Sequence, residues 1–220
     1  MTQEKTTPAT VAIIGLGKIG EIVAANLIKG RRPVILADRN LSKAKELAAR
    51  LGSLTRPMEI PDAIREADIV LLAVWFDAIK ELLVKYASGL RGKIIIDPSN
   101  PIAPDGKGGF VKTIGAKESA GQQIAELLPK DAKLVKAFSS LGAPSLAGAA
   151  FQQPERAVLF YATDDAGVNT TVEALIQDSG FDALRIGGID QSIRIEVFGD
   201  LHQFGALGKT VTLAEVKAKV

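Results

Sequence analysis

Runs of apolar residues alternate with amphipathic stretches along most of the chain, and this alternation predicts the secondary structure. The run Val11 to Ile14 is apolar throughout, which is typical of a strand buried on both faces of a parallel sheet. In the stretch after it, Ile19, Ile22, Val23 and Leu27 recur at helical spacing. Such patterns follow one another repeatedly, so we expect an α/β fold with a parallel sheet and helices on both faces.

The same patterns predict the order of the elements. Strands are expected at residues 10–14, 33–37, 53–54, 69–74, 93–96, 134–138, 157–161 and 183–186. Helices are expected at residues 18–29, 41–51, 62–66, 76–86, 119–128, 166–177 and 190–204, and from residue 212 onward. Residues 97–109 hold three prolines and three glycines, which predict a long loop at the carboxyl edge of the sheet. We interpret residues 1–188 as the sheet domain and residues 189–220 as a small helical C-terminal extension.

The first predicted strand runs directly into a glycine-rich turn with the sequence Gly15-Leu16-Gly17-Lys18-Ile19-Gly20. Gly15 permits a tight turn, Gly17 allows the backbone to approach a pyrophosphate, and Gly20 lets the helix pack close to the strand. The backbone N–H groups of Lys18 and Ile19 lie at the start of the predicted helix, where a phosphate is favoured. Strand, glycine turn and helix together predict a Rossmann-type dinucleotide-binding domain. The alternative is a tight turn without a ligand.

Charged residues follow the second predicted strand. Asp38 lies 18 residues after Gly20, where an acidic residue typically accepts hydrogen bonds from the adenosine ribose of NAD. Arg39 and Lys43 are cations of the kind that accommodate the 2′-phosphate of NADP. We expect these three residues to surround the adenosine ribose, with NADP favoured and NAD as the alternative. They also suit a simpler interpretation, in which Asp38 caps a helix and both cations are solvated.

Later loops at the same predicted edge supply further candidates. Ala73, Val74 and Trp75 end the strand that should lie beside the cofactor, and Trp75 either walls the site or belongs to the core. The amide of Asn100 suits hydrogen bonding to ribose or nicotinamide, with a purely structural loop role as the alternative.

Candidates for substrate contact come from the second half of the chain. Ser139 and Ser140 end a later strand, so their hydroxyl groups are expected near the nicotinamide. Neither lies in the Gly-x-Ser-x-Gly context of a hydrolase nucleophile. His202 is a candidate general base because of its pKa range, although a single histidine is more often structural.

Composition narrows the possible chemistry. The 220 residues carry a net charge of +2, which gives no reason to expect nucleic acid or an anionic membrane as partner. Without cysteine, and with one histidine, the chain has no thiolate nucleophile and no multi-histidine metal site, and we expect no metal. The first ten residues do not have the pattern of a secretory signal, and apolar runs are too short to span a bilayer. We therefore expect a cytoplasmic protein.

Five segments taken together resemble a known family, the NADP oxidoreductases that use the deazaflavin coenzyme factor-420, and their relatives that do not. The segments are Ile14-Gly-Leu-Gly-Lys-Ile-Gly20, Ala37-Asp-Arg-Asn40, Leu72-Ala-Val-Trp75, Ile96-Asp-Pro-Ser-Asn-Pro101 and Lys136-Ala-Phe-Ser-Ser140. Their order and spacing carry the resemblance, which spans nearly the whole chain. It implies a Rossmann domain with a small helical C-terminal part, usually dimeric, so we expect a homodimer.

The resemblance also implies direct hydride transfer between stacked nicotinamide and deazaflavin rings, without a side chain as acid or base. Two positions differ from the family pattern. The chain has Asp38-Arg39 where the deazaflavin enzymes tend to carry Ser-Arg, and Ser139-Ser140 where they tend to carry His-Thr. The small-molecule substrate that exchanges hydride with the cofactor is therefore open among a deazaflavin, a flavin, a quinone, a ferric complex and a small carbonyl compound.

These observations lead to one functional hypothesis and three alternatives. The sequence favours an oxidoreductase that transfers a hydride between NADP(H) and an unidentified acceptor. An NAD-dependent reductase of a small substrate differs from it only at the adenosine end. A non-catalytic NAD(P)-binding redox sensor has the same fold, but the long loop and the C-terminal segment suit a substrate cover. A methyltransferase is disfavoured by the tight spacing of the glycines.

Overall fold

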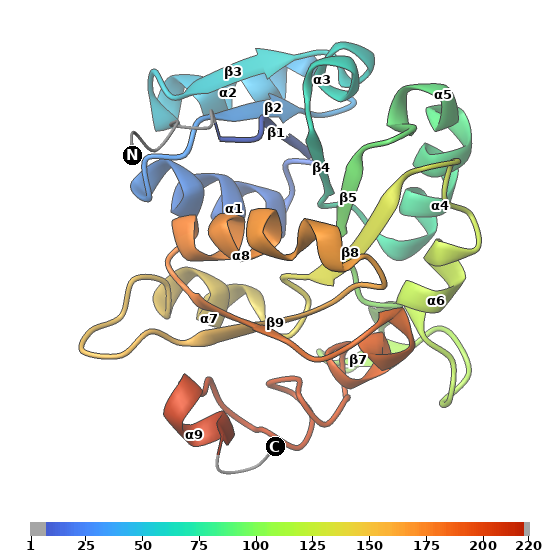
Figure 1. Cartoon of the computed structure of the whole chain (residues 1–220), viewed down its shortest axis with the longest axis vertical. Coiled ribbons are helices and arrows are strands. Elements are labelled where there is room, and N and C mark those ends of the chain that lie inside the picture. Colours follow the sequence, from blue (N-terminus) through green and yellow to red (C-terminus); the bar gives the residue numbers. More distant parts are fainter. Residues whose placement is uncertain (1–7, 218–220) are drawn as a thin grey trace.

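A twisted eight-stranded sheet forms the centre of the molecule (Figure 1). The computed structural model describes residues 8–217. Across the sheet the strands lie in the order β10 (Asp182–Arg185), β9 (Val158–Ala162), β8 (Lys133–Ala137), β5 (Ile94–Asp97), β4 (Ile69–Leu72), β1 (Val11–Ile14), β2 (Val34–Ala37) and β3 (Thr55–Met58).

The strand order reverses at β1, which pairs in parallel with both β2 and β4. From β3 to β8 all neighbouring strands are parallel, so their carboxyl ends share one edge of the sheet. Only the far end departs from the expected parallel sheet: β9 is antiparallel to β8, and β10 is parallel to β9. In parallel α/β sheets, ligands bind outside the carboxyl ends of the strands, at the point where the order reverses. The junction of β1 and β4 is that point here.

Helices cover both faces of the sheet because side chains alternate between the faces along each strand. Val11 and Ile13 join a core with α1 (Lys18–Lys29), α2 (Leu41–Leu51), α7 (Ala143–Gly148) and α8 (Asn169–Asp178). Ala12 and Ile14 join a second core with α3 (Ile60–Glu66), α4 (Phe76–Lys85), α5 (Ala87–Leu90) and α6 (Ala120–Ala125). The fold is therefore the expected α/β architecture, with its apolar strands buried on both sides.

The C-terminal segment packs on the antiparallel end of the sheet. Val158 and Phe160 of β9 form a third apolar cluster with Ile195, Leu201 and Val211. Figure 1 shows the last helix, α9 (Leu213–Lys217), below β9. The segment lies against the sheet and shares an apolar cluster with it. The division of the chain after residue 188 stays a prediction.

The segment after residue 188 differs from the prediction. In place of a helix at 190–204, a short 3-10 helix, η2 (Ile189–Arg194), is followed by turns. Phe198 has a positive φ of 70°, which ends helical geometry. A Cβ on Gly199 would lie 2.4 Å from the carbonyl oxygen of Arg194, so the chain turns back tightly on itself. Apolar periodicity did not reveal these turns.

Three further elements differ from the prediction. The third strand is Thr55–Met58 rather than 53–54, and it lies at the edge of the sheet. It contains Pro57, which has no N–H to donate and is tolerated in an edge strand because one side of that strand has no neighbour. The long loop contains a hairpin of β6 (Ile102–Pro104) and β7 (Phe110–Lys112). Helix α7 follows β8, where the apolar pattern is too short to predict a helix. Short elements carry too few residues for periodicity to identify them.

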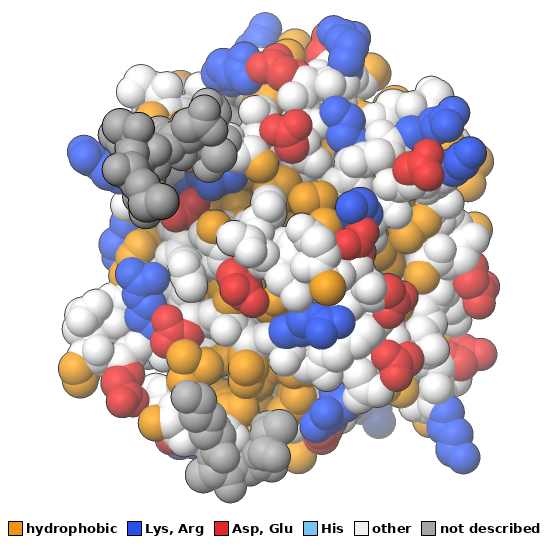
Figure 2. Space-filling view, in the orientation of Figure 1, with side chains coloured by type: hydrophobic (Ala, Val, Ile, Leu, Met, Phe, Trp, Pro, Cys, Tyr) orange, Lys and Arg blue, Asp and Glu red, His pale blue; other side chains and the backbone are white. Residues whose placement is uncertain are grey.

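Charges of both signs are interspersed on the face drawn in Figure 2, without a dominant basic or acidic area. Among residues 8–217, no helix is long and apolar enough to cross a membrane.

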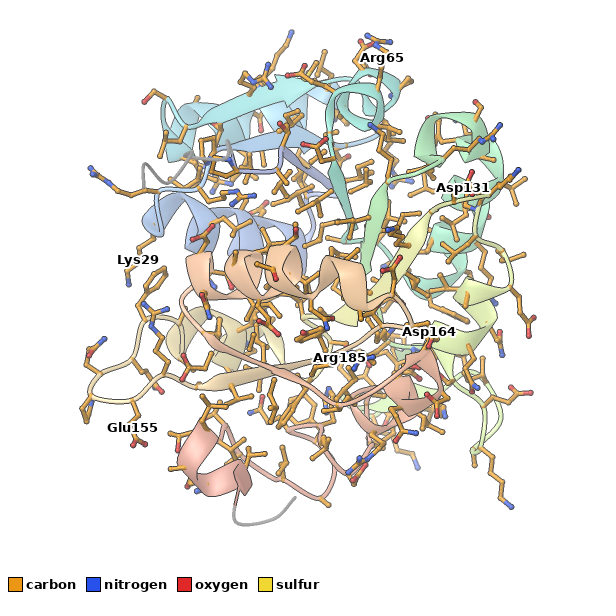
Figure 3. The ribbon with its side chains drawn as sticks, viewed as in Figure 1. Lys29, Arg65, Asp131, Glu155, Asp164 and Arg185 are labelled. Carbon is orange, nitrogen blue, oxygen red and sulfur yellow. The ribbon has the colours of Figure 1, made fainter. Side chains whose placement is uncertain are left out.

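The carboxyl end of α1 is joined to α8 and to the loop before β9. Arg32 pairs with Asp178 at 3.0 Å. The ammonium of Lys29, the last residue of α1 (labelled in Figure 3), lies 4.7 Å from the centre of the Phe151 ring. At Gly30 the two helices come so close that an added Cβ would lie 1.8 Å from the carbonyl oxygen of Asp178. Because glycine has no side chain, position 30 allows the end of α1 to pack against the end of α8, almost 150 residues further along the chain.

We predict that Gly30→Ala lowers the free energy of unfolding by about 2 kcal/mol or more, because a backbone contact must open. Gly148→Ala is the matched control, since no heavy atom lies within 4 Å of an added Cβ there. That control should change stability by less than about 1 kcal/mol. Urea unfolding of both variants measures the difference, and equal stability would contradict the close contact.

Candidate functional site

The loops that carry the predicted site residues meet at the carboxyl edge of the parallel strands (Figure 1). The glycine turn follows β1, Asp38 follows β2, and Ala73 to Trp75 follow β4. Asn100 lies beyond β5, and Ser139 and Ser140 lie beyond β8. Parallel topology thus brings together segments that are up to 125 residues apart.

The glycines of the turn have different structural roles. Gly15 has a φ of +90°, and a Cβ there would lie 2.6 Å from the carbonyl oxygen of Ala73. A Cβ on Gly20 would lie 2.0 Å from the carbonyl oxygen of Gly15. Both glycines are therefore needed for β1, α1 and β4 to pack. Gly17 is different, because no heavy atom lies within 4 Å of its added Cβ and its φ is an ordinary −72°. Nothing in the described chain requires glycine at position 17.

The amino end of α1 faces the same open space. The N-cap of this twelve-residue helix is Gly17, and no side chain caps it. The first N–H groups of a helix have no acceptor within the helix, and they carry partial positive charge. Leu16 is buried, whereas Gly17 and Lys18 are exposed and Ile19 is half-buried. The turn therefore presents backbone donors and a lysine to solvent.

Asp38 joins the ends of β1 and β2. One carboxylate oxygen accepts a hydrogen bond from the N–H of Leu16 at 2.9 Å, and the other accepts from the N–H of Asn40 at 3.1 Å. The cap of α2 is Asn40, whose side chain accepts from Ser42, so Asp38 is not the cap. The Asp38 carboxylate is held against the glycine turn.

Two cations lie close to Asp38 in the sequence. Arg39 is exposed and Lys43 is half-buried at the first turn of α2. Within residues 8–217, neither side chain makes an ion pair. Together with Lys18, they make the end of the site beside β2 positively charged.

The strand end beside the turn positions Trp75 at the surface. Ala73 and the Val74 side chain contact the turn, since a Cβ on Gly15 would lie 2.4 Å from the Cγ1 of Val74. Trp75 is the N-cap of α4, and it is 63% exposed. The interpretation of Trp75 as a core residue is therefore wrong, and its indole is available at the carboxyl edge.

Asn100 connects three segments. Its Nδ2 donates to the carbonyl oxygen of Ser139 at 3.1 Å, and its Oδ1 accepts from the N–H of Val197 at 2.7 Å. These contacts match the structural alternative for Asn100, because they use both ends of the amide. The side chain holds the loops after β5 and β8 against the C-terminal segment.

Ser139, Ser140 and His202 are all buried. The Ser139 hydroxyl donates to the carbonyl oxygen of Ile195 at 3.1 Å, whereas the Ser140 hydroxyl has no hydrogen-bond partner among the described residues. His202 Nδ1 accepts from the N–H of Phe204 at 2.9 Å. Burial lowers the pKa of His202 to about 4, and a hydrogen bond to the Ser139 backbone opposes the shift. At neutral pH His202 is therefore an uncharged, buried group that connects two loops.

A buried group of charges was not predicted from the sequence. Lys136 donates to Asp97 at 2.7 Å and to the carbonyl oxygen of Ser99 at 2.6 Å, and both charged side chains are fully buried. Glu196 lies 4.0 Å from Lys136, and it accepts hydrogen bonds from Ser119, Ala120 and Gly121 at the start of α6. A signal for this pair was available in the sequence: Asp97 ends one apolar strand, Lys136 interrupts another, and the sheet register places the two opposite each other.

Other features of the structure lie away from this edge. Two hollows of about 360 and 600 Å³ lie at the amino ends of the strands, near Asp68, Lys93 and Lys133. Among residues 8–217, no group of three or more His, Asp or Glu side chains is close enough to hold a metal ion.

We predict that His202 makes stability depend on pH between about 6.5 and about 4. Its pKa is lower in the folded state than its ordinary value of 6.5, so the folded chain binds fewer protons in this range. The contribution of His202 to the free energy of unfolding is fully present above pH 6.5 and is lost as the pH falls toward 4. The loss amounts to about 3 kcal/mol in all. His202→Gln, which keeps a donor and an acceptor, should reduce this dependence. Urea unfolding at pH 7.0 and 4.5 compares the two proteins, and identical pH dependence would contradict the role of burial.

Comparison with known proteins gives matches over this region and beyond. Residues 10–101 match the model of the family described as NADP oxidoreductase coenzyme F420-dependent. The F420-dependent NADP reductase of Methanothermobacter thermautotrophicus is 26% identical over 186 residues, which cover 83% of this chain and 79% of that protein. The Metalloreductase STEAP3 of Rattus norvegicus is 26% identical over 186 residues, covering 84% of this chain and 35% of that one.

The chain spans from 23% to 35% of the length of the first curated relatives that it matches. Among solved structures, the hypothetical protein SMa0349 from Sinorhizobium meliloti has a TM-score of 0.81 and 28% identity, with 93% of this chain and 95% of that chain covered. The family resemblance expected from the sequence is confirmed over residues 10–101, which match the model of the family described as NADP oxidoreductase coenzyme F420-dependent.

Proposed function

We propose that the protein is an NADP(H)-dependent oxidoreductase that transfers a hydride between the nicotinamide and a second small molecule. One observation carries this proposal. Gly17 lies at the uncapped amino end of α1, at the point where the strand order reverses, and the space beyond it is open. A glycine that the chain's own packing does not require is explained by a ligand that approaches its backbone. The family match over residues 10–101 supports the same conclusion.

The residues of the glycine turn suit a pyrophosphate. Gly15 and Gly20 allow β1, α1 and β4 to pack closely enough to form the turn. Gly17 leaves room for the phosphates, and the N–H groups of Lys18 and Ile19 lie at the helix end that favours an anion.

The other end of the site favours NADP over NAD. The Asp38 carboxylate already accepts two backbone hydrogen bonds, which stabilise its negative charge without a ribose. Arg39 and Lys43 have no acidic partner in the described chain, and they lie where a 2′-phosphate would add negative charge. A guanidinium binds phosphate through paired hydrogen bonds. NAD remains the alternative because Asp38 also suits a ribose diol.

The cofactor supplies the chemistry of hydride transfer when it is bound. The chain therefore has to bind and orient the two reacting molecules and to exclude water from between them. None of the three candidate catalytic residues is placed as an acid or base. His202 is uncharged and buried, and the Ser139 hydroxyl is used by the Ile195 carbonyl. Ser140 is the candidate whose buried hydroxyl is left for a bound ligand. This arrangement fits direct transfer between two bound molecules, which gains its rate from proximity.

Several identities of the second substrate fit this arrangement. The F420-dependent NADP reductase among the relatives favours a deazaflavin. The metalloreductase keeps a ferric complex open as an alternative. The family resemblance also favours a homodimer, and measurement of the molecular mass in solution tests this oligomeric state. The sequence favours a location in the cytoplasm.

We predict that Gly17→Val weakens NADPH binding at least tenfold, about 1.4 kcal/mol, because the new side chain fills the space for the pyrophosphate. The melting temperature should change little, since the packed chain leaves this space empty. Binding is measured by calorimetry and by Trp75 fluorescence, with Gly148→Ala as the control. Unchanged affinity for NADPH would refute the role of the turn.

We predict that Arg39→Ala weakens NADPH at least tenfold and NADH less than twofold, because only NADPH carries the 2′-phosphate. Lys45→Ala is a suitable control, since Lys45 is an exposed cation in α2, which begins two residues after Arg39. Equal losses for the two cofactors would show that Arg39 does not contact the phosphate. Tighter binding of NADH by the unaltered protein would instead assign the ribose to Asp38.

A further inference from the structure

Phe198 occupies a position in a tight turn that normally favours glycine. The N–H of Gly199 donates to the carbonyl oxygen of Glu196 at 2.8 Å, so Val197 and Phe198 are the central residues of the turn. Phe198 has a φ of 70°, in the left-handed region that bulky side chains rarely adopt. Glycine would adopt this conformation without a steric penalty. The phenylalanine therefore destabilises its own turn.

Packing does not compensate for this strain at Phe198. Phe138 also has a positive φ, of 62°, but its side chain is buried in the core, which stabilises it. The Phe198 side chain is 52% exposed. Strained residues that the fold does not need occur preferentially at functional sites. The exposed ring therefore needs an explanation outside the folding of the chain.

The backbone on the amino side of Phe198 is held firmly at the carboxyl edge. The N–H of Val197 donates to Asn100, in the loop after β5. The Glu196 carboxylate accepts from Ser119 and from the N–H groups of Ala120 and Gly121. These contacts hold the backbone just before Phe198 in place, so Phe198 lies at the same edge of the sheet as the predicted cofactor site.

A second half-exposed ring lies on a neighbouring turn. Phe204 is 55% exposed, and its ring covers Gly142, where an added Cβ would lie 2.7 Å from the Cζ atom of the ring. A Cβ on Gly205 would lie 1.8 Å from the carbonyl oxygen of Gly199, so the two turns are in contact. Phe198 and Phe204 thus lie on adjoining turns above the loops that end β5 and β8.

The charge next to these rings is neutralised. Asp200 lies two residues after Phe198, and it accepts three hydrogen bonds from the guanidinium of Arg194, at 2.8, 3.1 and 3.2 Å. His202, which contacts the Phe204 ring at 5.5 Å between centroids, is uncharged at neutral pH. The surface formed by the two phenylalanines is therefore apolar and aromatic, in contrast to the cationic end near Arg39.

We propose that Phe198, with Phe204 beside it, determines specificity for the second substrate, and that this substrate is bound through a flat aromatic ring. The proposal rests on the proposed oxidoreductase function. In a dinucleotide-binding sheet the cofactor crosses the edge at the strand reversal, so its nicotinamide half lies on the β4 and β5 side. The two phenylalanines are on that side, and aromatic rings stack favourably on phenyl groups. A small aliphatic carbonyl compound would gain little from them.

Phe198→Gly separates this role from a structural one. Glycine relieves the positive φ, so the melting temperature should stay the same or rise. Riboflavin and menadione serve as probes, titrated into both the free and the NADP⁺-loaded protein by fluorescence and by calorimetry. We expect the unaltered protein to bind at least one of them, and Phe198→Gly to weaken that binding at least tenfold. NADPH affinity, measured separately, should not change.

Two further variants complete the experiment. Phe204→Leu keeps an apolar side chain but loses the ring, and should weaken binding less than Phe198→Gly. Val84→Ala removes an exposed apolar side chain from α4, and should have no effect.

Three results would overturn the proposal: neither probe binds the unaltered protein, Phe198→Gly binds as well as the unaltered protein, or the substitution dissociates a dimer without changing probe binding. The last result would assign the two rings to contact with a second copy of the chain. If the unaltered protein does not bind NADPH, the proposed function itself is refuted instead.

Discussion

The structure depends on a close approach of backbone to backbone where β1, α1 and β4 meet. The Gly15 N–H donates to the carbonyl oxygen of Ala37, and the positions of Gly15 and Gly20 leave no room for a Cβ. This contact lets the helix begin directly above the strand, so its free N–H groups face the carboxyl edge. Any side chain there would separate helix and strand, and the site would lose its geometry.

A second constraint holds the other half of that edge together. The buried Lys136–Asp97 pair connects β8 to β5, and Glu196 connects the C-terminal segment to α6. Removing one partner of a buried ion pair typically lowers the free energy of unfolding by about 3–5 kcal/mol, because the remaining charge is buried without a partner and without water. Asn100 adds a neutral connection between the same segments. The loops at the carboxyl edge beyond β5 are thus joined by polar contacts as well as by apolar packing.

The two ends of the edge differ in chemistry. Near β2, exposed cations and helix N–H groups suit phosphate. Near β5 and β8, two half-exposed phenylalanines lie on turns that contact Asn100, Gly142 and the uncharged His202. Such a division suits a hydride transfer, in which charge holds the cofactor in place and a dry surface orients the molecule that reacts with it.

Local patterns in the sequence were enough to predict the α/β class, the helices over 18–29 and 41–51, and the glycine turn, because each depends on neighbouring residues. The same patterns missed the turns after residue 194 and the third strand, where contacts with distant residues outweigh local preference. The different roles that the motif predicts for its glycines agree with the packing, which needs Gly15 and Gly20 but leaves open space at Gly17. Pairing of Asp97 with Lys136, burial of His202 and exposure of Trp75 and Phe198 all depend on which strands become neighbours. Only the tertiary structure decides that, because burial and electrostatic environment arise from contacts between residues far apart in the chain.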